Sequence, residues 1–290
     1  MFDPQDSPRV FGLAPGVDFP AALVDGLRAR MAGEPPEAMA RVELIVNTTR
    51  MARRIRGIFD TGPACVLPRI RLLTSLADPV ALAQLPAPVS PLRRRLELTG
   101  LVSKLLDAQP DLAPRAALFD LADSLATLMD EMQDEGVPPE TLAALDVSDE
   151  SGHWLRTLEF LKIVQRYFGT GEEAPDPIAL RRLALEQRLA AWEAQPPDHP
   201  VILAGSTGSR GSTHRLMCAV SKLPQGALVL PGFDFDMPGP VWEGLDDALA
   251  AEDHPQFRFS RLLGELGIDP TTLPAWTGTP PPSATRNRLV

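Results

Sequence analysis

Apolar positions along the first 75 residues form short runs separated by helical repeats. The runs predict strands at residues 9–14, 42–46 and 70–73. Two intervening stretches repeat apolar residues every three or four positions and predict helices at 19–31 and 51–59. Asp18 can cap the first helix, and Thr48 or Thr49 the second. This β-α-β-α-β order predicts a parallel sheet whose ligand crevice lies at the carboxyl ends of its strands.

The pattern becomes helical after the prolines at positions 86, 88 and 91. Helical repeats follow at 92–106, 118–132, 154–168 and 178–192. Strands are predicted again at 201–204 and 227–230, with a helix around 216–220 between them. The fold class is therefore α/β, with a parallel sheet interrupted by a helical-bundle insertion. The predicted parts are 1–85, the insertion 86–198, the second α/β part 199–268, and a Pro-rich segment 269–290.

The net charge of −10 argues against general affinity for nucleic acids. Charge is distributed unevenly, however. Residues 1–104 hold 14 Lys and Arg against 10 Asp and Glu, a net of +4, while the remaining 186 hold 14 against 28, a net of −14. The early arginines form three clusters, at 50–56, 69–71 and 93–95. Each cluster either lies on a solvated face or forms a local track for phosphates.

Other features exclude several classes of function. The N-terminal segment lacks the basic start and apolar run of a signal peptide, and no stretch reaches membrane-span length, so we expect a cytoplasmic protein without membrane association. Cys65 and Cys218 are far apart and lack histidines at zinc-finger spacing. The four histidines are scattered, and Asp234 and Asp236 fit a solvated loop better than a metal site. We therefore expect no catalytic residue, metal or cofactor in this chain.

Two loops are candidates for a phosphate-binding site. The loop after the first strand has no lysine following a glycine, Pro15 lacks an N–H, and Asp18 places a negative charge where phosphate would lie. The loop 205–213 is glycine-rich and precedes a helix, so Gly208, Arg210 and Ser212 are candidate anion contacts. Its spacing matches neither phosphate-binding pattern, which favours a structural turn. The alternative function is an enzyme that binds a phosphorylated small molecule here.

Several segments, in order, resemble a known family. They are VFGLAPGVDFPAALVDGLRAR, VELIVNTTRMARRIRGIF, LPRIRLLTSL, VILAGSTGSRGSTHRLMCAVSKLPQGALVLPGFDFDMPGPVW and EDHPQFRFSRLLGELG. Together they are similar to the N-terminal region of AddB, the double-strand break repair subunit, in its alphaproteobacterial form. The resemblance runs from about Val10 to Val290.

The resemblance implies an inactivated superfamily 1 helicase-like domain that pairs with an AddA-type helicase-nuclease subunit and handles DNA before recombination. Thr48, Arg50 and Ala52 match a helicase motif that touches single-stranded DNA. Arg53 and Arg54 can share a helix face with Arg50, whereas Arg56 cannot. We thus expect Thr48, Arg50, Arg53 and Arg54 to bind DNA.

Three features of the family are missing here. The Walker A lysine and the Walker B acids have no counterpart, and the four-cysteine iron-sulfur nuclease domain is absent, so we expect a partial copy. The expected function is a non-motor, DNA-handling and partner-binding region. A structural module without DNA contact is the third alternative.

Overall fold

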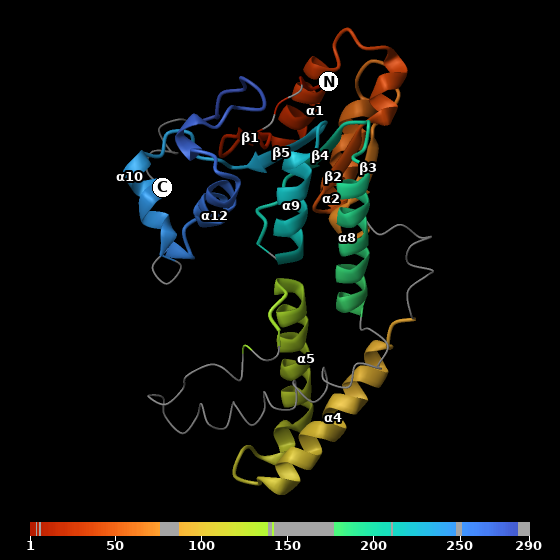
Figure 1. Cartoon of the computed structure of the whole chain (residues 1–290), viewed down its shortest axis with the longest axis vertical. Helices are drawn as coiled ribbons and strands as arrows, with labels where there is room; N and C mark the ends of the chain where they lie inside the picture. The colour runs from red at the N-terminus through yellow and green to blue at the C-terminus, as the bar shows by residue number, and fades with distance from the viewer. Residues whose placement is uncertain are drawn as a thin grey trace. The chain divides into compact units, whose positions relative to one another are not determined.

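The chain contains a five-stranded, all-parallel sheet. The computed structural model describes residues 1–75 except 4 and 6, 87–138, 141, 177–247 except 210, and 251–283. The strands are β1 (Val10–Leu13), β2 (Glu43–Val46), β3 (Arg69–Leu72), β4 (Val201–Ala204) and β5 (Gly226–Pro231). Their order across the sheet is β1-β5-β4-β2-β3 (Figure 1). The predicted α/β class, the parallel sheet and the five strand positions are confirmed.

Burial along the strands follows their place in the sheet. Every residue of β2 and β4 is buried, as expected for inner strands of a parallel sheet that helices cover on both faces. In β3, residues alternate between exposed and partly buried, because this strand lies at the sheet edge and has one neighbour.

The helices that connect the strands fall into two groups. Helices α1 (Phe19–Arg30) and α2 (Thr49–Asp60) pack against each other, and α9 (Gly211–Lys222) packs on β4, β5 and α12 (Phe257–Leu266). The connections through α1 (β1 to β2) and α2 (β2 to β3) both lead toward the β3 edge of the sheet. The connection through α9 (β4 to β5) leads toward the β1 edge. Right-handed crossovers then place the two groups on opposite faces. The direction changes between β2 and β4, which makes this pair the topological switch point.

Trp276 closes the edge of the sheet beside β1. Its backbone N–H donates to the Gly12 carbonyl at 2.8 Å, and its indole Nε1 donates to the Leu23 carbonyl of α1 at 3.1 Å. The side chain is 2% exposed, and the Arg30 guanidinium lies 3.6 Å from the ring centroid. The first part of the predicted Pro-rich segment 269–290 is therefore integrated into the core.

The chain divides into two compact units, one of residues 1–76 and 188–290 and one of residues 77–187. In the second unit α4 (Pro91–Ala108) and α5 (Leu118–Glu135) pack through a shared apolar core, as the repeats at 92–106 and 118–132 predict. Helix α8 (Pro177–Ala194) covers the repeat at 178–192. The predicted helix at 154–168 lies outside the described residues, and the helical-bundle insertion stays a prediction.

Short elements complete the described chain. They are η1 (Pro36–Arg41), η2 (Leu73–Ser75), η3 (Arg115–Ala117), α10 (Gly239–Glu243), η4 (Gly244–Asp246) and η5 (Pro270–Thr272). None of the helices in the described part combines the length and apolar character needed to cross a bilayer.

Candidate functional site

The loops after β2 and β4 meet at the switch point of the sheet. The Asn47 side chain, directly after β2, donates from Nδ2 to the Gly205 carbonyl, directly after β4, at 2.5 Å. Gly205 has a φ of +79°, and a Cβ there would lie 2.8 Å from Sδ of Met51. Only a glycine allows this loop to approach the first turn of α2 so closely. Asn47 was not among the residues expected from the sequence, although its position directly after a buried strand was an available signal.

Thr48 is the N-cap of α2. Its backbone is extended, and its Oγ1 accepts a hydrogen bond from the Met51 amide at 3.1 Å. Of the two predicted caps, Thr48 rather than Thr49 has this role. The capping hydrogen bond therefore explains the conformation of Thr48 without any ligand. The Thr48 hydroxyl can still donate its hydrogen to a bound group. The remaining amides of the first turn and the helix dipole make this end of α2 favourable for an anion.

The arginines of α2 lie on its solvent side. The opposite side is buried and consists of Met51, Ala52, Ile55 and Phe59. Arg50, Arg53 and Arg54 are exposed and share one face by helical spacing, as predicted. Arg56 is also exposed and lies beyond Arg53, away from Arg50 and Arg54. No described residue forms an ion pair with Arg50, Arg53 or Arg56.

Arg54 differs because it already has a partner. Its Nη2 lies 3.2 Å from Oδ2 of Asp18, the N-cap of α1, and both side chains are more than half exposed. An exposed pair of this kind contributes at most about 1 kcal/mol to stability. A phosphate could therefore compete for Arg54, while the Asp18 carboxylate would weaken the attraction.

The other two arginine clusters are used within the fold. In the cluster 93–95, each arginine pairs with an acid, namely Arg93 with Glu97 at 2.7 Å, Arg94 with Asp130 at 2.5 Å, and Arg95 with Asp123 at 2.7 Å. On β3, Arg71 lies 3.5 Å from Glu43, and Arg69 donates to the Arg41 carbonyl at 2.9 Å. Only the cluster on α2 thus presents several arginines without acidic partners among the described residues.

The loop after β4 is largely occupied by its own contacts. Gly208 is buried with a φ of +69°, and its amide donates to Oγ of Ser206 at 3.3 Å. Ser212 is partly buried in the first turn of α9, and Arg210 lies outside the described residues. A phosphate at Gly208 would have to displace the Ser206 hydroxyl. This geometry favours the structural turn over the phosphorylated-ligand site.

The loop after β1 also lacks the geometry of a phosphate cradle. Asp18 Oδ1 accepts from the Ala21 amide at 3.4 Å, so a carboxylate lies at the start of α1. Gly16 has a φ of +80°, and a Cβ there would approach Pro282 to 3.2 Å. The position that binds phosphate in P-loop proteins is therefore negatively charged and partly covered.

A cavity of about 450 Å³ lies beyond the ends of β1 and β5. Its walls include Pro15, Met237, Pro238, Val241 and two acids, Asp234 and Asp236. The amide of Asp236 donates to Asp234 Oδ1 at 2.9 Å, which closes a local turn and fits the predicted solvated loop. The described residues of the loop 205–213 do not line this cavity. Its acidic rim disfavours phosphates.

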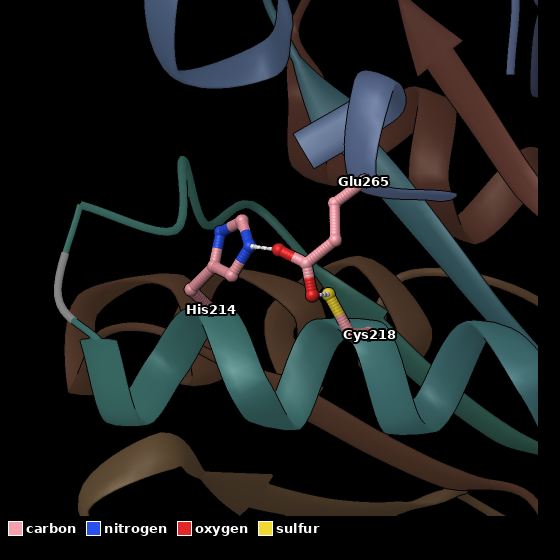
Figure 2. A group of neighbouring side chains, drawn as sticks. All are labelled: His214, Cys218 and Glu265. Atoms are coloured by element: carbon pink, nitrogen blue, oxygen red, sulfur yellow. Dashed lines mark hydrogen bonds and ion pairs between the residues drawn. The ribbon is translucent and has the colours of Figure 1, made fainter. Parts of the chain in front are cut away.

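A group of three side chains joins α9 to α12 (Figure 2). His214 Nε2 lies 2.6 Å from Glu265 Oε2, and the Cys218 thiol donates to Glu265 Oε1 at 3.4 Å. The hydrogen bond from His214 lowers the pKa of Glu265. Burial raises the pKa of Cys218 to about 12, and the negative charge of Glu265 adds to this effect. This group was not expected from the sequence, although the spacing of four residues between His214 and Cys218 on a helix was a usable signal.

No protein-family model matches this chain, and the search of curated proteins found no match. The roles of Thr48, Arg50, Arg53 and Arg54 in DNA binding, and of Gly208, Arg210 and Ser212 in anion binding, therefore stay predictions.

Proposed function

We propose that this chain is a non-motor, DNA-handling region of an AddAB-type helicase-nuclease, acting in double-strand break repair. It holds single-stranded DNA by its phosphates and leaves the chemistry to a partner subunit. The proposal rests on one observation, supported by the resemblance given above. Arginines without acidic partners lie on α2, directly beside the switch point where Asn47 contacts Gly205.

The position of the arginines supports this role. Ligands of parallel α/β sheets bind at the carboxyl ends of the strands, at the switch point. Arg50 stands in the first turn of α2, where its side chain and the helix dipole both attract a phosphate. Arg53 lies three residues along the same face, so a strand of DNA that passes Arg50 can also reach Arg53.

Charge explains why a partner subunit is needed. The net of −14 over residues 105–290 repels DNA from most of the surface, which leaves only the local arginine track. Non-specific affinity from a few phosphate contacts is typically ~10⁻⁴ to 10⁻⁶ M at physiological salt. We therefore infer that an AddA-type subunit supplies further DNA contacts.

Fluorescence anisotropy with a labelled oligothymidylate tests the DNA contact directly. Replacing Arg50 and Arg53 with alanine should weaken binding by about tenfold, near 1.4 kcal/mol. Replacing Arg181 and Arg261 with alanine is the matched control, because it removes the same charge from exposed positions on other helices. Equal losses in the double variant and the control would show that only overall charge matters and would remove the proposed track.

A further inference from the structure

We propose that His214, Cys218 and Glu265 form a binding site for Zn²⁺ that joins α9 to α12. The proposal concerns a site away from the arginine track and is independent of the DNA-handling function. His214 and Cys218 stand one turn apart on α9, so their side chains share a face. Glu265 reaches the same point from the last turn of α12 (Figure 2).

The distances fit a metal centre after a small adjustment. The three donor atoms all lie within 4.8 Å of one another. Zinc bonds of about 2.0–2.3 Å in a tetrahedral arrangement place two ligand atoms roughly 3.3–3.6 Å apart. Cys218 Sγ and Glu265 Oε1, at 3.4 Å, already have that separation. His214 Nε2 lies 2.6 Å from the other carboxylate oxygen, Oε2, and this separation must increase by less than ~1 Å. The half-exposed Glu265 side chain must turn so that one oxygen faces both partners, and the three donor atoms, now within 4.8 Å, must draw together to the zinc spacing.

The donor set and its burial favour zinc over harder cations. Imidazole nitrogen, thiolate sulfur and carboxylate oxygen are the three protein ligands that Zn²⁺ uses, whereas Mg²⁺ and Ca²⁺ prefer oxygen ligands alone. Cys218 is 7% exposed, and the side chains of His214 and Glu265 are 15% and 54% exposed. The site is therefore closed on the side of the fold and accessible on one side, where water can complete the coordination.

Zinc would replace protons that now hold the group together. The thiol proton lies between Cys218 and Glu265, and binding of the metal would release it to solvent as the sulfur becomes a thiolate. Lys222, one turn beyond Cys218, acts electrostatically on both Cys218 and Glu265 and partly offsets the attraction for a cation.

Cobalt substitution of the full chain tests the site. Co²⁺ added to metal-free protein should give a thiolate-to-cobalt charge-transfer band at one equivalent, and Zn²⁺ should abolish the band. Cys218→Ser should remove the band, and His214→Asn and Glu265→Gln should each weaken binding at least tenfold. Cys65→Ser is the control, since Cys65 is exposed and lies outside the group, and it should leave the titration unchanged.

Two outcomes would overturn the proposal. One is the absence of a thiolate band in the wild-type chain, which would identify the group as a hydrogen-bonded contact between two helices. The other is an unchanged titration in Glu265→Gln, whose exposed side chain makes misfolding an unsuitable explanation. Alkylation of the wild-type chain gives a second measurement that needs no variant. Zn²⁺ should slow the labelling of Cys218 and leave that of Cys65 unaltered.

Discussion

Arg54 Nη2 lies 3.2 Å from the Asp18 carboxylate, so an arginine expected to contact DNA faces an acid from a neighbouring helix. Replacing Asp18 with asparagine keeps an N-cap residue and removes the charge. We expect single-stranded DNA to bind more tightly to this variant. The salt dependence should become steeper by about 0.7, the value of one added phosphate contact.

Asp60→Asn is the control for Asp18→Asn, because it makes the same change in net charge at the other end of α2. Anisotropy titrations at several salt concentrations should show no change in slope for this control. A steeper slope in both variants would mean that net charge, and not the release of Arg54, explains the result.

Glu43 is the centre of a buried charge network at the amino end of β2. Its side chain is 6% exposed and lies 2.6 Å from Arg188 and 3.5 Å from Arg71, with His199 at 3.6 Å. Glu43→Gln removes the buried carboxylate charge that Arg188 and Arg71 face, and loss of one partner from such a pair costs about 3–5 kcal/mol. Chemical denaturation should show this loss, whereas Glu37→Gln, at an exposed position, should change stability by less than about 0.5 kcal/mol.

Alanine substitution should have opposite effects on stability at Gly205 and at Gly57. At Gly205 the positive φ and the nearby Met51 sulfur make a side chain unfavourable, so Gly205→Ala should cost about 1–3 kcal/mol. At Gly57, within α2, an added Cβ meets nothing within 4 Å, and the substitution should stabilise by about 0.5–1 kcal/mol. Thermal unfolding of both variants checks the pair. Stabilisation by Gly205→Ala would contradict the described approach of the loop to α2.

Trp276 tests whether the segment after α12 belongs to the fold. Trp276→Ala removes a fully buried ring that packs on Arg30 and α1, and it should destabilise the chain by about 3–5 kcal/mol. Phe119→Ala on α5, where the ring is 56% exposed, should have little effect. Comparable unfolding midpoints in the two variants would place this segment outside the cooperative fold.

The sheet could be predicted from the sequence because its inner strands are short, continuous apolar runs. The runs at 42–46 and 201–204 are visible without any knowledge of neighbours, and the helical repeats between strands give the connection order. Trp276 could not be placed in this way. Its burial depends on a backbone pairing with Gly12, more than 260 residues earlier in the sequence.

The same limit applied to the candidate sites. Helical spacing alone predicted that Arg50, Arg53 and Arg54 share a face. It could not show that Asp18 pairs with Arg54, or that Arg94 and Arg95 pair with acids of α5, because those acids come from other elements. Likewise, Glu265 reaches His214 and Cys218 only through the packing of α12 on α9.

The salt dependence of single-stranded DNA binding tests the proposed arginine track most directly. Each lost phosphate contact lowers the slope of log affinity against log salt by about 0.7. Replacing Arg50, Arg53 and Arg54 together with alanine should therefore reduce the slope by about 1.4, because Arg54 is already paired with Asp18 in the wild type. Arg261→Ala, at an exposed position on α12, should leave it close to the wild-type value. An unchanged slope in the triple variant would contradict the account and assign these arginines to a solvated helix face.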